Sequence, residues 1–116
     1  MVRLSILYPQ TAESHFSMEY YINKHIPLVI AKLKHMGLKR IHIEEGVGDA
    51  VPNMPAPFAA IGYMTFTSVD ELQRGFTRHG SEIMGDIPNF TNVQPLIQIS
   101  RILPKIHRSS SPGQLL

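Results

Sequence analysis

His25 has the side chain and the surroundings that acid–base chemistry requires, because it lies on an apolar helical face two residues before a proline. Apolar residues recur at three- and four-residue spacing over 15–36, which predicts an amphipathic helix. An imidazole titrates near neutral pH, and burial in such a face can adjust its pKa for proton transfer. We therefore predict that His25 is a general acid or base; the alternative is a core histidine that donates to a backbone carbonyl. The residues predicted to share its face are Met18, Tyr21, Ile22, Leu28, Val29, Leu33 and Met36.

Pro27 favours a pocket beside His25. A proline cannot donate to the carbonyl oxygen four residues before it, here that of Asn23, and its ring crowds the same turn. We therefore expect the helix to bend or open at this turn. A break beside a polar group on an apolar face can form a cavity, which favours the functional interpretation of His25.

Two tyrosines could present a hydroxyl to a ligand near His25. Tyr20 and Tyr21 are consecutive, so about 100° separates them on a helix, and only Tyr21 shares the face of His25. Tyr63 belongs to a predicted strand. Each hydroxyl could bind a polar ligand group, although each ring could also serve only as core. Met18 is a candidate apolar wall residue, because a thioether adapts to irregular shapes; its alternative is ordinary core packing.

The chain has no pattern typical of a metal or cofactor site. His15, His25 and His35 are ten residues apart on different helix faces, and no pair has metal-ligand spacing. The segment 46–49 (Gly-Val-Gly-Asp) is not followed by the Gly-Lys-Ser/Thr of a phosphate loop. The chain has no cysteine, which excludes disulfides and thiolate chemistry. We predict that the protein uses neither a metal nor a cofactor.

The charge balance argues against nucleic acid, and the hydropathy argues against a membrane. The chain carries 11 Lys and Arg against 9 Asp and Glu, and the excess lies at Lys105 and Arg108. No clustered surplus of cations remains to release counterions from a nucleic acid. No apolar run approaches the roughly 20 residues of a membrane span, and no secretion signal opens the chain. We therefore expect a cytoplasmic protein.

The predicted elements follow the order β-α-β-β-α-β over residues 1–103. Period-two alternation predicts strands at 2–8, 38–45, 58–67 and 93–102, and helical spacing predicts helices at 15–36 and from 69 onward. Ser68 is the expected N-cap of the second helix, in a capping box with Glu71. This order predicts an α+β, ferredoxin-like fold, with an antiparallel four-stranded sheet and two helices on one face. Residues 104–116 are predicted to form a flexible C-terminal tail.

Strand 58–67 is apolar on both of its faces. A strand in a two-layer domain normally has one set of side chains that faces solvent. We therefore predict that a second copy of the sheet covers the exposed set, in a homodimer. One set contains Phe58, Ala60, Gly62, Met64 and Phe66, and the other contains Ala59, Ile61, Tyr63 and Thr65.

Two segments of the chain resemble the EthD family. One reads Tyr20-Tyr21-x-x-x-His25-x-Pro27-Leu28, after a strand that ends in Tyr-Pro, and the other is segment 87–95, Ile-Pro-Asn-Phe-Thr-Asn-Val-Gln-Pro. The resemblance covers about residues 2–102. It implies a dimeric α/β-barrel, in which two ferredoxin-like sheets pair and the helices lie outside. It also implies that the motif histidine of catalytic members corresponds to His25, with Asn89 to Asn92 at the rim of the pocket.

The resemblance also implies a class of function. The family is named for a protein linked to ethyl tert-butyl ether degradation, and similar proteins include methylmuconolactone isomerases and fungal decarboxylases or dehydratases that act without cofactors. We predict a cofactor-free isomerase, lyase or oxygenase that acts on a small apolar, oxygen-bearing molecule. His25 would transfer the proton, and the predicted substrate-binding residues are Tyr21, Met18, Tyr63 and Asn92. The alternatives are a non-catalytic binding or accessory protein with the same pocket, and a structural dimer in which His25 is a satisfied core residue.

Overall fold

The sheet has four antiparallel strands in the neighbour order β2-β3-β1-β4. The computed structural model describes residues 1–104. The strands are β1 (Val2–Pro9), β2 (Leu38–Glu45), β3 (Phe58–Phe66) and β4 (Leu96–Arg101). The two most apolar strands, β1 and β3, lie in the centre, where both of their edges are paired. The element order and the antiparallel sheet confirm the predicted α+β, ferredoxin-like fold.

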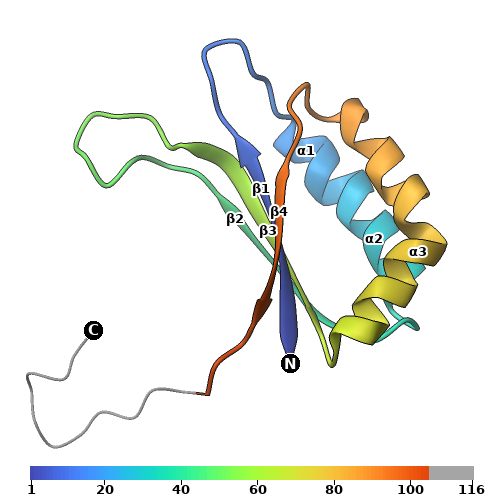
Figure 1. Cartoon of the computed structure of the whole chain (residues 1–116). Helices are drawn as coiled ribbons and strands as arrows, with labels where there is room; N and C mark the ends of the chain where they lie inside the picture. The colour runs from blue at the N-terminus through green and yellow to red at the C-terminus, as the bar shows by residue number, and fades with distance from the viewer. Residues whose placement is uncertain (105–116) are drawn as a thin grey trace, which may run out of the picture.

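All helical segments pack on one face of the sheet (Figure 1). The first helix is shorter than predicted and has three parts: α1 (Met18–Tyr20), a π-helical turn η1 (Tyr21–His25) and α2 (Ile26–Leu33). The second helix, α3 (Val69–Asp86), continues into a 3-10 turn, η2 (Ile87–Asn89). Ser68 caps α3 as predicted, because its hydroxyl accepts a hydrogen bond from the Glu71 amide at 3.2 Å.

The break expected before Pro27 takes the form of the π-helical turn. The amide of Ile26 donates to the carbonyl of Tyr21, five residues earlier, which is the hydrogen-bond pattern of a π-bulge. Tyr21 and His25 are both buried, with 2% of each residue exposed. The prediction for Ile22 was wrong, since it is 45% exposed: the wider turn carries this residue away from the position that a regular α-helix would give it.

Two rows of side chains cross the helix-facing side of the sheet. Because directly paired residues point to the same side of a sheet, the pairing defines each row. Leu4 and Ile6 of β1 are buried, whereas Ile97 and Ile99 of β4 are 46% and 42% exposed. The helices therefore cover the central strands and leave the β4 side of this face partly open. From β2 to β4, one row is Ile43, Gly62, Ile6 and Ile97, and the other is Ile41, Met64, Leu4 and Ile99.

The opposite face of the sheet has no helix over it within residues 1–104 (Figure 1). It carries the second side-chain set of β3, in which Ile61 and Tyr63 are half-buried and Thr65 is buried. The neighbouring strands add charged groups to this face, including Arg3 on β1 and Glu44 on β2. This face is therefore more polar than strand 58–67 alone suggested, and the homodimer stays a prediction.

The segment 46–57 connects β2 and β3 and projects from the end of the sheet (Figure 1). Residues 105–116, which belong to the predicted flexible tail, lie outside the described residues. Across residues 1–104, none of the helices combines the length and the apolar character that a bilayer span requires.

Candidate functional site

His25 pairs with a carboxylate that lies 61 residues away in the chain. Its Nδ1 is 2.9 Å from Oδ2 of Asp86. The imidazole comes from the π-helical turn and the carboxylate from the last residue of α3, and the two meet because α2 and α3 pack against each other. The side chain of His25 is 3% exposed and that of Asp86 is 14% exposed. A buried imidazole and a partly buried carboxylate therefore form an acid–base pair at the C-terminal end of α3.

Three donors converge on the carboxylate of Asp86. Besides His25, the hydroxyl of Tyr20 donates to Oδ1 at 2.7 Å and the Nδ2 of Asn89 donates to Oδ1 at 2.9 Å. Burial alone would raise the pKa of Asp86, but the hydrogen bonds from Asn89, His25 and Tyr20 outweigh it and hold the pKa below its ordinary value. Asp86 is therefore ionised at neutral pH.

Burial and the carboxylate of Asp86 together determine the protonation state of His25. Burial lowers the pKa of His25 below its ordinary value, and the hydrogen bond and charge of Asp86 offset this only in part. The imidazole is thus neutral at pH 7, and the proton facing an ionised carboxylate must lie on Nδ1. Nε2 then carries the lone pair, and it makes no hydrogen bond to any residue of the part described. This arrangement is that of a general base.

Aromatic rings hold the imidazole in place. The ring of Tyr21 stacks on that of His25, with 5.8 Å between centroids and 17° between planes, and the ring of Phe90 lies 4.6 Å away. The π-helical turn contributes both Tyr21 and His25, which places the two rings side by side on the buried face. Because packing on two sides restricts the imidazole, its orientation toward Asp86 is fixed before any ligand binds.

A small cavity of about 10 Å³ lies beside the imidazole. Its wall includes His25, Tyr21, Ile6 and Gly62, and this volume holds at most about one water molecule. The hydroxyl of Tyr21 fits here because residue 62 is a glycine: a β-carbon at this position would lie 2.5 Å from the Tyr21 hydroxyl oxygen. Burial raises the pKa of Tyr21 to about 12, so its hydroxyl remains a hydrogen-bond donor at neutral pH.

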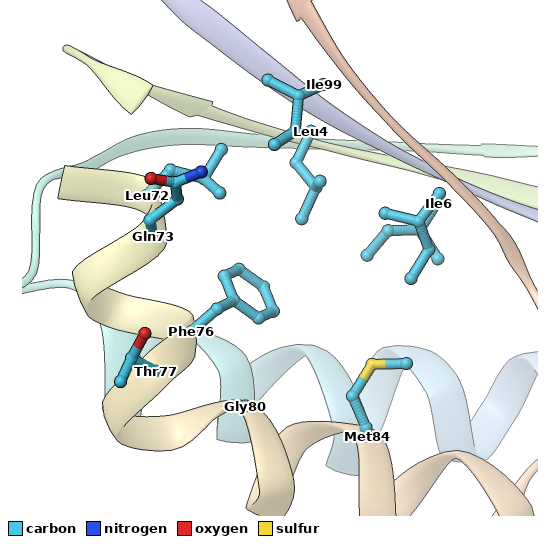
Figure 2. Close-up of a pocket in the computed structure, with 10 residues that line it drawn as sticks. Leu4, Ile6, Leu72, Gln73, Phe76, Thr77, Gly80, Met84 and Ile99 are labelled. Atoms are coloured by element: carbon cyan, nitrogen blue, oxygen red, sulfur yellow. The ribbon is translucent and has the colours of Figure 1, made fainter. Parts of the chain in front are cut away.

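A much larger apolar cleft of about 660 Å³ lies between α3 and the β1–β4 side of the sheet (Figure 2). Figure 2 shows Leu4, Ile6 and Ile99 pointing from the sheet toward Phe76 and Met84 of α3. Ile6 also lines the cavity beside His25, and among residues 1–104 it is the one residue that the two spaces share. The volume lies within the range of about 300–1,000 Å³ that is typical of small-molecule pockets.

The structure places three of the predicted site residues, His25, Tyr21 and Tyr63, on the same small cavity, and the rings of His25 and Tyr21 are stacked. Tyr63 borders the same cavity, but its hydroxyl donates to Glu44 at 3.2 Å on the helix-free face of the sheet. Met18 lines a separate shallow cleft near Phe16. The ligand-binding roles of Tyr63 and Met18 therefore stay predictions, and of the two only Tyr63 borders the cavity of His25.

Asn92 lies in the loop after η2 and ties two segments of backbone together. Its Oδ1 accepts from the amide of His15 at 2.9 Å, and its Nδ2 donates to the carbonyl of Glu13 at 3.0 Å. It also borders a cleft next to the loop, apart from the cavity of His25. The observed contacts give Asn92 a role in loop structure, and its role in substrate binding stays a prediction.

Asp86 and Tyr20 are the site residues that sequence reasoning missed. No helical or strand spacing relates Asp86 to His25, because the pair depends on how two helices pack. One signal was present: Asp86 immediately precedes the segment 87–95 that carries the family resemblance. Tyr20 was set aside because it lies off the face of His25, yet its hydroxyl reaches Asp86. Within residues 1–104, no group of three or more metal-ligating side chains is assembled.

The fold and the site define a class of protein: a ferredoxin-like α+β domain with a buried histidine, His25, in its first helix. The chain belongs to the EthD family, since the EthD domain profile matches residues 9–94. No match was found among curated proteins.

Solved structures of similar proteins support this assignment. An EthD-like protein from Ralstonia eutropha JMP134 has 29% sequence identity and a TM-score of 0.83, over 95% of this chain and 96% of that one. An EthD family protein from Bacillus halodurans C-125 has 22% identity and a TM-score of 0.64, over 89% of this chain and 99% of that one. A dimeric ferredoxin-like protein from an uncultured marine organism has 12% identity and a TM-score of 0.58, over 93% and 100%. The last two similarities concern the fold alone.

Proposed function

We propose that this protein is an enzyme that uses His25 to transfer a proton on a small, mostly apolar, oxygen-bearing molecule. The observation that carries the proposal is the pair of His25 and Asp86, in which Nδ1 faces an ionised carboxylate and Nε2 is left with its lone pair. A neutral, buried and oriented imidazole is a suitable base near neutral pH. The reaction class is that of a cofactor-free isomerase, lyase or oxygenase.

The geometry supports a proton transfer next to a carbonyl group. Nε2 of His25 takes a proton from the carbon beside the carbonyl, the C–H electron pair moves into an enolate, and Asp86 stabilises the imidazolium that forms. The hydroxyl of Tyr21, which lines the same cavity, donates a hydrogen bond to the enolate oxygen. In a β,γ-unsaturated carbonyl compound the enolate extends over the second double bond. The imidazolium of His25 then returns the proton to the γ-carbon, the double bond moves next to the carbonyl group, and the isomerisation is complete with atoms and charge balanced.

The proposed enzyme acts as a homodimer, with a second copy of the sheet over the helix-free face. Ile61 and Tyr63 on this face offer apolar surface that no helix of residues 1–104 covers. The Nε of Arg3 is buried without a hydrogen-bond acceptor in the same described part. Buried donors are rarely left unpaired, so an acceptor from a second copy would complete this contact.

A non-catalytic binding protein is the second candidate, and the apolar cleft favours it. The cleft is far larger than the cavity of His25, and no titratable side chain of residues 1–104 lines it. Under this alternative, His25 is only a hydrogen-bond partner at the inner end of a ligand pocket. A ligand would then bind without any chemical change.

Turnover of a simple enol lactone distinguishes the two candidate functions, because only an enzyme would convert it. α-Angelica lactone isomerises to its conjugated form when a proton leaves one ring carbon and returns to another, and NMR in D₂O measures both exchange and isomerisation. We expect His25→Ala to lower the catalysed rate by about 10²–10⁴-fold while the variant stays folded. His35→Ala, an exposed histidine beyond α2, is the matched control and should keep the rate. Equal rates for wild type and His25→Ala would rule out the proposed base.

A further inference from the structure

The cavity beside His25 cannot hold a substrate as it stands. Its volume of about 10 Å³ is that of roughly one water molecule. A substrate of even six or so non-hydrogen atoms therefore needs space from a neighbouring region. The side chain that separates the cavity from other space decides where the substrate comes from.

Ile6 separates the two spaces because of the register of the sheet. In the row that crosses the sheet, Ile6 pairs with Gly62 on β3 and with Ile97 on β4. The hydroxyl of Tyr21 lies over Gly62, on the side of the cavity. Ile97 lines the apolar cleft on the other side. The side chain of Ile6, which is 5% exposed, thus stands between the site of proton transfer and the cleft.

The cleft has the chemistry of a site for the hydrocarbon part of a ligand. Most of its lining is aliphatic or aromatic, and Phe76 and Met84 face the isoleucines of the sheet across it (Figure 2). Gln73 and Thr77 are its polar lining side chains, and both come from the first half of α3. An apolar body with few polar groups and no charge fits this composition.

We propose that the cleft between α3 and β4 binds the apolar body of the substrate, and that Ile6 is the residue past which the reacting carbonyl end reaches His25. This inference rests on the proposed function for the identity of the reacting end. The binding site itself, and its connection to His25 through Ile6, do not depend on turnover. The substrate class is a neutral molecule with a hydrocarbon part and one carbonyl-bearing end.

A neutral fluorescent probe tests the inference without any chemical step. N-phenyl-1-naphthylamine is added to the full chain, its binding is followed by fluorescence, and the imidazole resonances of His25 are followed by NMR at probe saturation. We expect Ile99→Asp to weaken probe binding at least about tenfold, because an apolar probe in the cleft would displace water from the aspartate charge. Unchanged affinity in this variant would place the probe elsewhere and overturn the proposal.

Leu4 provides the matched control for Ile6. Both residues lie on β1, point to the helices, are buried and line the cleft, but only Ile6 also lines the cavity of His25. We expect the probe to shift the His25 resonances at least about twofold more in Ile6→Ala than in wild type or Leu4→Ala. Ile6→Val removes a single methyl group and so disturbs a packed core less than the alanine substitution does. It should give an intermediate shift, and it keeps the test valid if Ile6→Ala does not fold.

The outcomes separate this inference from the proposed function. Equal shifts in Ile6→Ala and Leu4→Ala, or no probe binding to the wild type, would overturn the connection through Ile6. The His25 shift could increase from wild type to Ile6→Val to Ile6→Ala while His25→Ala isomerises the lactone at the wild-type rate. That result would support the binding site and rule out the catalytic role of His25.

Discussion

The carboxylate of Asp86 accepts a hydrogen bond from the buried imidazole of His25 across 2.9 Å, at the point where the second helix ends against the π-helical turn of the first. Tyr20 and Asn89 hold the other oxygen of the same carboxylate. The pair is therefore oriented from both sides before any ligand arrives. The consequences of this pair for activity and stability can each be measured.

Asp86→Asn should disable His25 while leaving the shape of the site intact. The asparagine amide can donate to Nδ1, which favours the tautomer with its proton on Nε2 and removes the basic lone pair from the cavity side. We expect lactone isomerisation to fall about 100-fold or more, with a change in the ¹⁵N shifts of the His25 ring. Glu82→Gln, on the surface of the same helix in a pair with Lys32, is the control. A wild-type rate with unaltered ¹⁵N shifts in Asp86→Asn would contradict this role.

The stability of the protein should fall as the pH drops through 6.5. Burial holds the pKa of His25 below 6.5 in the folded state, so the unfolded chain binds this proton at a higher pH than the folded chain does. Stability rises with pH wherever the unfolded state binds more protons. The free energy of unfolding therefore decreases on acidification from 6.5 and levels off below the folded pKa of His25.

His25→Gln isolates this contribution, because glutamine does not titrate. Urea unfolding from about pH 7.5 to about pH 5.5 should give a flatter profile for the variant than for wild type. Asp86 stabilises the fold separately at acid pH. Because the folded pKa of Asp86 lies below 3.8, its contribution to the free energy of unfolding is present above that value and is lost as the pH falls toward the folded pKa. Parallel profiles for wild type and His25→Gln above pH 5 would contradict the burial of a neutral imidazole.

Gly62→Ala should displace the hydroxyl of Tyr21. The added β-carbon would lie 2.5 Å from that oxygen, and overpacking of this kind costs about 1–3 kcal/mol. Removing the oxygen by Tyr21→Phe should recover part of the loss, which a double-mutant cycle from chemical unfolding measures. Gly85→Ala is the control, because no atom within residues 1–104 lies within 4 Å of its added β-carbon and alanine is the better helix former. Additive effects of Gly62→Ala and Tyr21→Phe would show that the two positions do not meet.

Ile61→Lys should convert the proposed dimer into monomers. The lysine places a charge on the helix-free face of the sheet, and Glu44, which pairs with position 61 across β2 and β3, can accept it within one monomer. The fold is thus preserved while packing of two sheets is disfavoured. Sedimentation velocity measures the change, with Val47→Lys, at a residue that is 97% exposed, as the control. If the wild-type protein is already monomeric at micromolar concentration, the proposed homodimer is wrong.

Local patterns in the sequence determined the helices and strands and placed the rings of Tyr21 and His25 on the same face. Period-two alternation located the four strands, and Ser68 marked the start of α3, because these signals depend only on neighbours in the chain. The spacing of Tyr21 and His25 placed both rings on one buried face, and Pro27 predicted a break in the same helix. The π-helical form of that break was not predicted, so Ile22 was assigned to the wrong face.

Packing between distant segments decided the chemistry of the site. Asp86 reaches His25 only because α3 ends beside the first helix, and no sequence spacing encodes that contact over 61 residues. Ile6 stands between a small cavity and a large cleft only because strand register pairs it with Gly62 on one side and Ile97 on the other. Short-range spacing thus determines which side chains share a face, whereas long-range packing determines which faces meet, and acid–base function depends on the second.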